Sequence, residues 1–320
     1  MRFIDYQSGT LRIEQMPAPE AGVEEVIVAV EAFGINRADL LQREGKYPPP
    51  KGESPVLGLE VAGTVAELGA GVTGWKPGDK VCALVPGGGY AELVRVKAAQ
   101  LMPIPDGMSM QSAAGLPEIF LTAYGALIRN GQLVAGQKVL IHAGASGVGS
   151  AAIQLCKVLG AKVAVTASSQ EKLAFCQSLG ADLLVNYRTE DVVEKILGQW
   201  PGVDLIVDIV GGKQTNSNLK LLNLDGRIVQ LAMLAGRLVQ EFDMGRLLQK
   251  RATLMGSTLR NRSDEYKAHL VADLLAQHGP DFAQQRLQVP LDSTYKVSDL
   301  EQAHQRMVRN QNLGKMVGYW

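Results

Sequence analysis

Residues 138–172 decide the fold, and they read KVLIHAGASGVGSAAIQLCKVLGAKVAVTASSQEK. An apolar run at 139–143 predicts a buried strand, and residues 147–159 have the spacing of an amphipathic helix. A second apolar run at 162–166 predicts another strand. A strand, a glycine-rich turn, a helix and a second strand, in that order, are typical of a dinucleotide-binding site.

The loop between the first strand and the helix reads GASGVG, so its glycines are spaced GxxGxG rather than GxGxxG. Glycines allow the sharp turn and let backbone N–H groups approach a pyrophosphate, whose charge is favoured at a helix N-terminus. The alternative is a glycine turn that serves only close packing of helix and strands. The cofactor contacts expected in this loop are Gly144, Ser146, Gly147, Val148 and Gly149.

The end of the second strand indicates which nucleotide is bound. A site that prefers NAD usually has Asp or Glu there to bond the ribose 2′-hydroxyl, whereas this chain reads TASS at 166–169. No carboxylate repels a 2′-phosphate, Ser168 can donate a hydrogen bond to it, and Lys172 lies one helical turn onward to neutralise it. The sequence therefore favours NADPH. Alternatively, Lys172 is a solvated lysine on the helix surface.

Two patterns organise the rest of the chain. Short alternating runs between turn residues predict a β-rich region over 1–121. Over 122–260, apolar strands alternate with helices, which predicts an α/β fold with a doubly wound parallel sheet. Residues 261–320 are too few for a core of their own, so we expect strands at 285–289 and 315–319 to pack back on the first region. The strands expected in the parallel sheet are 139–143, 162–166, 182–185, 205–210, 227–232 and 253–258.

Composition excludes several classes of protein. Of 320 residues, 46% are hydrophobic and 20% charged, so the chain is neither disordered nor collagen-like. Its 32 basic and 32 acidic side chains cancel, which leaves no net charge to hold a nucleic acid. Three widely spaced cysteines, no signal-peptide pattern and no long apolar run favour a cytoplasmic protein without a zinc cage or a membrane span.

Several motifs in series give the chain a family resemblance. In chain order they are GINRADLLQREGKYPPP at 34–50, PVLGLEVAGTV at 55–65, WKPGDKV at 75–81, PEIFLTAYGAL at 117–127, GSTLRNRSDEYK at 256–267 and LGKMVGYW at 313–320. With the HAGASGVG loop, they resemble the medium-chain dehydrogenase/reductase superfamily, specifically its zinc-free quinone oxidoreductase branch around zeta-crystallin. The tumour-suppressor-inducible quinone oxidoreductase type is the most similar, and the resemblance covers the whole chain.

The resemblance implies a GroES-like substrate domain interrupted by a Rossmann domain, with the nicotinamide in the cleft. It also implies a homodimer joined edge to edge through the strand at 253–258, since exposed sheet edges pair readily. Alcohol dehydrogenases of the superfamily hold zinc with a cysteine, a histidine followed by glutamate, and a third ligand. This chain has Asn36 at the first position and Leu59 before Glu60 at the second, so we expect no metal.

The resemblance also names residues of the site. Asn36, Tyr47 and Thr122 are the expected catalytic residues, and Tyr47 and Thr122 would also contact the cofactor. Alternatively, Asn36 only caps a helix, Tyr47 only packs on its proline turn, Ser146 caps the loop helix with or without bonding a phosphate, and Lys315 is only a terminal charge. The remaining cofactor contacts implied are Tyr187, Gly211, Leu231, Leu259 and Lys315.

Without a metal or an evident base, the protein would hold NADPH against a flat electrophile and let the cofactor supply the hydride. A quinone suits this chemistry because the resulting anion is delocalised, so the sequence predicts an NADPH:quinone reductase. Two alternatives stay open. One is an NADPH-dependent reductase of α,β-unsaturated carbonyls, which differs in needing a proton donor for the α-carbon. The other is an NADPH-binding protein with little turnover.

Overall fold

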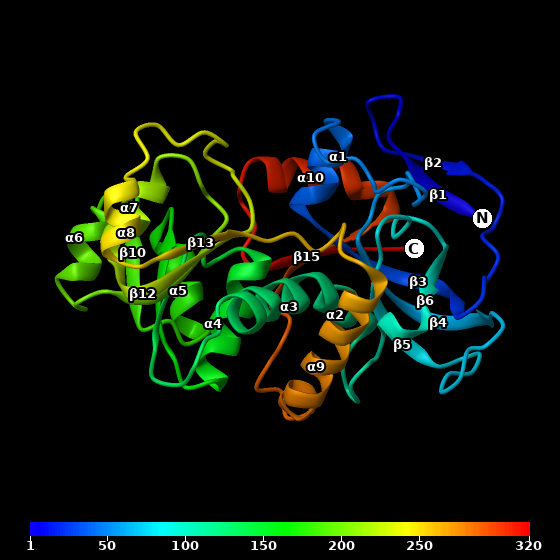
Figure 1. Cartoon of the computed structure of the whole chain (residues 1–320). Helices are drawn as coiled ribbons and strands as arrows, with labels where there is room; N and C mark the ends of the chain where they lie inside the picture. The colour runs from blue at the N-terminus through cyan, green and yellow to red at the C-terminus, as the bar shows by residue number, and fades with distance from the viewer. The chain divides into compact units, whose positions relative to one another are not determined.

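The computed structural model describes residues 1–320, and the chain divides into two compact units (Figure 1). The first, called here the β-rich unit, contains Met1–Leu121 and Leu259–Trp320. The second, the parallel-sheet unit, contains Thr122–Thr258. The second division therefore comes after Thr258 rather than after residue 260.

One six-stranded sheet forms the centre of the parallel-sheet unit, and every pair of neighbouring strands in it is parallel. The strand order is β10-β9-β8-β11-β12-β13, so the chain begins in the middle, moves to one edge and then continues to the other. This order confirms the predicted doubly wound sheet. The strands are β8 (Lys138–Ile141), β9 (Lys162–Ala167), β10 (Leu183–Asn186), β11 (Val203–Asp208), β12 (Leu222–Gln230) and β13 (Thr253–Gly256).

Helices connect the strands of this sheet and cover it. Leu140, Ala164, Val185 and Ile206, one from each of four neighbouring strands, are all 0% exposed and share one hydrophobic core. Strands that are covered on both faces read as continuous apolar runs, which is why the sequence pattern is so clear here. The helices are α4 (Gly147–Val158), α5 (Gln170–Ser178), α6 (Val192–Leu197), α7 (Gln214–Leu221) and α8 (Met244–Gln249).

The β-rich unit contains a seven-stranded sheet in the order β14-β15-β3-β4-β5-β7, with β6 also paired to β3. Two further strands, β1 and β2, form a separate antiparallel pair. The core of the unit includes Phe33 and Tyr90, whose ring centroids lie 4.4 Å apart. The strands are β1 (Arg2–Asp5), β2 (Arg12–Gln15), β3 (Glu25–Ile35), β4 (Glu60–Leu68), β5 (Lys80–Leu84), β6 (Leu93–Lys97), β7 (Leu101–Pro103), β14 (Leu291–Lys296) and β15 (Lys315–Tyr319).

The last segment of the chain completes this sheet. β15 runs antiparallel to β3, with Met316 opposite Ile35, and β14 pairs with its other edge in parallel. The expectation that residues 261–320 pack back on the first region is therefore confirmed. The final strand also brings Lys315 next to the end of β3, which matters for the site.

The prediction of a strand at 285–289 was wrong. The helix α9 continues to Ala283, Gln285 has a φ of 57°, and the strand of this region, β14, begins only at Leu291. Leu287 and Val289 are buried while Gln288 between them is exposed, so loop packing imitates the alternation of a strand. The remaining helices are α1 (Arg37–Arg43), α2 (Met110–Ala114), α3 (Leu116–Tyr124), α9 (Asp264–Ala283) and α10 (Leu300–Val308). None of the helices combines the length and apolar composition that a bilayer-spanning helix needs.

Candidate active site

The glycine loop joins the end of β8 to the start of α4. Ser146 is the N-cap of α4, and its Oγ accepts a hydrogen bond from Gly149 N at 3.0 Å. This is the capping role that the sequence allowed for Ser146, and the hydroxyl keeps its own proton for an anion. The N–H groups of Gly147 and Val148 lie in the first turn, lack an intrahelical acceptor and bond no other backbone oxygen. Together these donors at the positive end of a helix fit a pyrophosphate.

Two of the glycines are also required by packing. A Cβ on Gly144 would lie 2.8 Å from Cβ of Val165 and 3.0 Å from Sγ of Cys176. A Cβ on Gly149 would lie 2.6 Å from the carbonyl oxygen of Ala143. The glycines therefore allow the helix and the strands to pack closely, which is the alternative role for the loop. This packing is compatible with phosphate binding.

A buried polar chain fixes the loops at the carboxyl end of the sheet. His142 Nε2 lies 2.8 Å from Asn218 Oδ1, and Asn218 Nδ2 donates to Asp208 Oδ2 at 2.9 Å. Because Asn218 presents its oxygen to His142, Nε2 carries a proton. His142 Nδ1 lies 3.0 Å from Thr166 Oγ1, and Asp208 Oδ1 accepts from the N–H of Gly211 at 3.0 Å. This hydrogen-bonded chain thus ties together the ends of β8, β9 and β11, and no sequence motif indicates it.

The residues expected at the 2′-phosphate follow the carboxyl ends of β9 and β10. Ser168 comes directly after β9, and Ser169 caps α5 by accepting from Lys172 N at 3.3 Å. Tyr187 N donates to Ala167 O at 3.2 Å, which brings the half-exposed tyrosine beside the end of β9. Hydroxyls rather than a carboxylate follow the end of β9 directly, where the ribose is bound in this type of sheet, and Glu171 and Lys172 come next in the first turn of α5.

Other predicted contacts follow later strands or lie outside this unit. Gly211, with a φ of 66°, follows β11, and Leu231 N donates to Asp208 O at 2.7 Å after β12. The carboxyl ends of parallel strands share one edge of the sheet, so both lie at the same edge as the glycine loop. Thr122 Oγ1 is buried without a hydrogen-bond partner, as expected of a group that a ligand satisfies. Leu259 belongs to the β-rich unit, and its contact with the cofactor stays a prediction.

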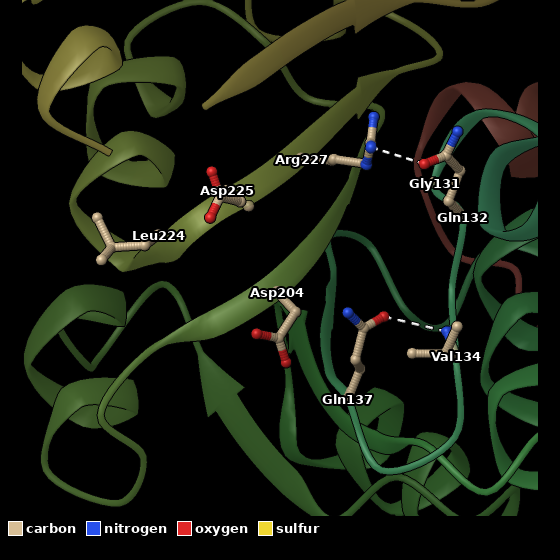
Figure 2. Close-up of a pocket in the computed structure, with 9 residues that line it drawn as sticks. Gly131, Gln132, Val134, Gln137, Asp204, Leu224, Asp225 and Arg227 are labelled. Carbon is tan, nitrogen blue, oxygen red and sulfur yellow. Dashed lines mark hydrogen bonds between the residues drawn. The ribbon is translucent and has the colours of Figure 1, made fainter. Parts of the chain in front are cut away.

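A pocket of about 290 Å³ lies at the opposite edge of the parallel sheet (Figure 2). It lies where β12 departs from regular pairing with β11, between Leu222 and Arg227. Its polar groups bond their neighbours: Arg227 donates to Gln132 Oε1 at 2.6 Å, and Gln137 Oε1 accepts from Val134 N at 3.1 Å (Figure 2). We assign no role to this pocket because the side chains that could bind a ligand are already paired.

In the β-rich unit, Asn36 occupies the N-cap position of α1, at the end of β3. Its backbone N–H donates to Asp39 Oδ2 at 2.8 Å. Its side-chain amide reaches other elements: Nδ2 donates to Glu60 Oε1 at 2.9 Å, and Oδ1 accepts from Lys315 Nζ at 2.6 Å. Asn36 is therefore both a helix-capping residue by position and a member of a buried charged cluster.

Lys315 and Glu60 form a buried ion pair, with side chains 2% and 0% exposed. Lys315 Nζ also donates to Ile35 O at 3.3 Å, and Glu60 Oε2 accepts from Glu118 N at 2.8 Å. Burying two charges is expensive unless they are paired and hydrogen-bonded, and here both conditions are met. Lys315 is therefore not a loose terminal charge, and its contact with the cofactor stays a prediction.

The ring of Tyr47 packs against the guanidinium of Arg260, which lies 5.3 Å from the ring centroid. Arg260 also donates to Tyr47 O at 3.1 Å, to Pro86 O at 2.7 Å and to Gln42 Oε1 at 2.7 Å. These bonds hold the turn of Tyr47 in place from a residue far along the chain. Tyr47 thus has a cation partner in addition to its proline turn, and burial raises the pKa of its phenol.

Glu118, in the first turn of α3, adds a second carboxyl to this cluster. Burial, followed by the negative charge of Glu60, raises its pKa to about 8, so it is protonated at neutral pH. Glu60 is the carboxylate that Lys315 neutralises, and Glu118 is left as the neutral acid. Neighbouring carboxyl groups in environments this different are the pattern from which acid and base roles arise.

A second chain of buried polar side chains contacts α1. Asp39 Oδ2 accepts from Tyr90 Oη at 3.1 Å, and Oη lies 3.1 Å from His304 Nε2. His304 Nδ1 faces an N–H of Arg43 at 3.0 Å, and burial followed by this positive charge lowers the pKa of His304 to about 3. Burial raises the pKa of Asp39 to about 6. The helix α1, which Asn36 caps by position, is therefore anchored through neutral histidine and tyrosine to the rest of the unit.

Comparisons with known proteins agree with this arrangement. Residues 22–106 match the family model described as alcohol dehydrogenase GroES-like domain, and residues 147–276 match zinc-binding dehydrogenase. A quinone oxidoreductase-like protein 2 homolog of Nematostella vectensis is 32% identical over 302 residues, which are 92% of this chain and 82% of that protein. The chain belongs to the medium-chain dehydrogenase/reductase superfamily. This confirms the family resemblance and the combination of a Rossmann-like with a GroES-like domain.

Other members of the medium-chain superfamily are similar over most of this chain. The synaptic vesicle membrane protein VAT-1 homolog of Danio rerio is 32% identical over 317 residues, which are 94% of this chain but 65% of that protein. The solved quinone oxidoreductase of Thermus thermophilus, whose structure was also determined with NADPH, has a TM-score of 0.84 and 32% identity. That comparison covers 100% of both chains.

The residues of this superfamily member do not fit a zinc ion, although one matching family model is described as zinc-binding. No three His, Cys, Asp or Glu side chains are grouped so that they could hold a metal. Cys82, Cys156 and Cys176 are all buried, and burial raises the pKa of each thiol, that of Cys176 to about 12. Because zinc binds the thiolate form, these cysteines are poor ligands.

Proposed function

We propose that the chain is an NADPH-dependent quinone reductase. The observation that carries the proposal is the end of β9, where Ser168 and Ser169 take the place of the acidic residue of an NAD site and Lys172 follows in α5, beside a glycine loop with uncommitted first-turn N–H groups. A 2′-phosphate needs such donors and a positive charge. The related Thermus thermophilus enzyme, a quinone oxidoreductase solved with NADPH, supports the same assignment.

Each unit of the chain would have its own task. In the parallel-sheet unit, Gly147, Val148 and Ser146 would bind the pyrophosphate, and the unpartnered hydroxyl of Thr122 would bond a polar group of the cofactor. NADPH, when bound, supplies the hydride. In the β-rich unit, the aromatic face of Tyr47 and the amide of Asn36 would hold the flat electrophile. No group of side chains in the chain is arranged to hold a metal ion, so no step of the proposed reaction uses a metal.

A specific observation favours reduction of α,β-unsaturated carbonyls as a second candidate. Conjugate addition of a hydride to an enone leaves an enolate whose α-carbon must be protonated. Glu118 is a carboxylic acid kept neutral at pH 7, in the same cluster as Asn36 and Tyr47. Its proton would pass to the α-carbon, and the carboxylate would recover a proton from solvent.

Steady-state oxidation of NADPH with a benzoquinone, a naphthoquinone and an alkenal separates these functions. Turnover of the quinones supports the first proposal, whereas turnover confined to the alkenal removes it in favour of the second. Tight NADPH binding with no oxidation across the panel would instead identify a nucleotide-binding protein with little turnover. Elemental analysis of the active protein tests independence from metal, since stoichiometric zinc needed for turnover would contradict the proposal.

Assembly and location belong to the same proposal. β13 is the last strand of the parallel sheet and pairs only with β12, so its outer edge is open to a second copy of the chain, and Leu254 on it is 40% exposed. An open edge is a natural pairing surface. We expect a homodimer by sedimentation analysis, and a monomer at micromolar concentration would contradict it. The three free cysteines suit the reducing cytoplasm.

A further inference from the structure

The amide of Asn36 is held by two opposite charges, and their chemistry fixes its orientation. Lys315 can only donate, so the atom it contacts at 2.6 Å is the amide oxygen. Glu60 is the ionised partner and accepts, so the atom at 2.9 Å is the amide nitrogen. Rotating the amide by 180° would set donor against donor and acceptor against acceptor. Asn36 therefore has one orientation.

The sheet register places these three residues with little freedom. Asn36 follows β3, whose Ile35 is opposite Met316 on β15, so Lys315 lies next to it. Glu60 begins β4, the neighbour of β3 on its other side. Lys315 Nζ and Glu60 Oε2 make further bonds to backbone groups, Ile35 O and Glu118 N, so neither charge can turn away. Two rigid strands thus clamp the amide between them.

Two glycines make room for the ion pair, which is an independent sign that the chain is built around it. A Cβ on Gly34 would overlap the carboxylate of Glu60. A Cβ on Gly115 would lie 2.7 Å from Cγ of Lys315. Neither glycine has a positive φ, so backbone conformation does not require glycine at these positions. The space they leave is occupied by the two charged side chains.

We propose that Lys315 and Glu60 are positioning residues of the reductase site, which act by holding the Asn36 amide so that its second N–H donates to the oxygen of the electrophile. The inference rests on the proposed function and deepens it. Nδ2 has two N–H groups and Glu60 takes one, while Asn36 itself is only partly buried. With the amide oxygen bonded to an ammonium, the free N–H is a stronger donor. It would stabilise the negative charge that develops on a quinone or enone oxygen as the hydride is added.

A double-mutant cycle tests whether Lys315 acts through Asn36. We use Asn36→Ala, the charge-neutral pair Lys315→Met/Glu60→Gln, and the triple variant, with kcat measured at saturating NADPH. Each of the first two should lower kcat about tenfold to a hundredfold, and the triple variant should be no slower than Asn36→Ala within a factor of about two. NADPH affinity should change little in all three. Losses that multiply in the triple variant would overturn the proposal.

Removing both charges together avoids leaving one of them buried alone, and thermal melting shows whether each variant is folded. The matched control is the ion pair of Lys97 with Glu25, at 2.8 Å, which also involves β3 but lies at the surface. The variant Lys97→Met/Glu25→Gln should leave kcat unchanged. A comparable loss in this control would mean that any ion pair on β3 has the same effect, and would count against positioning.

A measurement without substrate separates this inference from the proposed function. In protein labelled with ¹⁵N at asparagine, the side-chain NH₂ signal of Asn36 is assigned by its loss in Asn36→Ala. That signal should shift in Lys315→Met/Glu60→Gln, while the signal of Asn218 in the other unit should not. An unchanged Asn36 signal would overturn the positioning role even in an active enzyme. A shifted signal in a protein that reduces no electrophile would overturn the proposed function and the donor role of Asn36, but not the positioning of its amide by Lys315 and Glu60.

Discussion

The candidate site residues of the two units are of different chemical kinds. In the parallel-sheet unit, the expected cofactor site consists mainly of backbone N–H groups, hydroxyls and small residues, and its buried hydrogen-bonded chain from His142 to Asp208 contains a single carboxyl group. In the β-rich unit, Asn36 lies among buried charges from residues far apart in the chain, Glu60 and Lys315. A site made by one continuous stretch can be recognised as a motif. A site made by long-range ion pairs depends on the whole sheet, and its parts should be more sensitive to single substitutions.

The largest effect that we expect is from Lys315→Met alone. This variant leaves the carboxylate of Glu60 buried without its partner, and breaking a buried pair in this way costs about 3–5 kcal/mol. The apparent melting temperature should fall steeply, and Lys315→Met/Glu60→Gln should recover much of the loss. If the single and double variants melt at the same temperature, the ion pair does not carry the stability of this region.

The matching substitution in the other unit is Gly144→Ala. Its Cβ would lie within 3.0 Å of Val165 and Cys176, so the loop must shift away from its position before α4. NADPH affinity, measured by calorimetry, should fall at least about tenfold, in keeping with the sensitivity of binding geometry to small displacements. Gly245→Ala on α8 is the control, because its Cβ meets only a side-chain atom at 3.4 Å. Unchanged affinity in Gly144→Ala would show that the loop tolerates the shift.

Glu118→Gln sharpens the comparison through pH. The pKa of Glu118 is raised by burial from 4.5 to about 8, so between these values the unfolded chain ionises here while the folded chain keeps its proton. The folded state then binds more protons, and the contribution of Glu118 to stability falls as pH rises from 4.5 to 8. Gln does not ionise, so it removes this loss. The free energy of unfolding of the variant, relative to that of the wild type, should therefore rise by more than about 1 kcal/mol between about pH 5 and pH 8.

Thermal melting of both proteins at the two pH values measures this difference. The control is Glu67→Gln, at an exposed position of β4. Its stability relative to the wild type should not change over the same pH interval. An equal difference between Glu118→Gln and wild type at both pH values would mean that Glu118 is ionised in the folded protein. The neutral acid needed for enone reduction would then be lost as well.

The smallest effect concerns Lys172. We expect the protein to bind NADPH more tightly than NADH by more than about 1 kcal/mol, the scale of a charge-assisted hydrogen bond. Lys172→Ala should narrow this preference, mainly by weakening NADPH binding, and calorimetry with both nucleotides measures it. Lys162→Ala, an exposed lysine at the start of β9 and so at the other end of that strand, serves as the control. If Lys172→Ala keeps the full preference for NADPH over NADH, Lys172 does not bind the 2′-phosphate.

Sequence predicted the parallel-sheet unit well because its information is local. The strands read as apolar runs, and the glycine loop, Ser168 and Lys172 all fall within residues 138–172. The β-rich part of the candidate site could be predicted only through family resemblance, which named Asn36, Tyr47 and Lys315 but did not indicate that Lys315 pairs with Glu60. The roles of Glu60, Glu118 and Arg260 were missed, since register and burial decide them.

A signal for the missed residues was nevertheless present. Glu60, Glu118 and Lys315 each stand inside an otherwise apolar stretch, PVLGLEVAGTV, LPEIFL and LGKMVGYW. A charged residue in such a stretch must find a partner or lose its charge when it is buried. Pairing Lys315 with Glu60 and neutralising Glu118 is the solution that this fold adopts.

The buried cysteines have a consequence for the proposed reduction of quinones or enones. Quinones and enones alkylate exposed thiolates, and an enzyme that concentrates such compounds is at risk of being inactivated by them. All three thiols here are enclosed in the two cores and held in the protonated form by burial, which makes them poor nucleophiles. For the proposed quinone reductase, resistance to covalent damage by electrophiles is thus built into the folded chain.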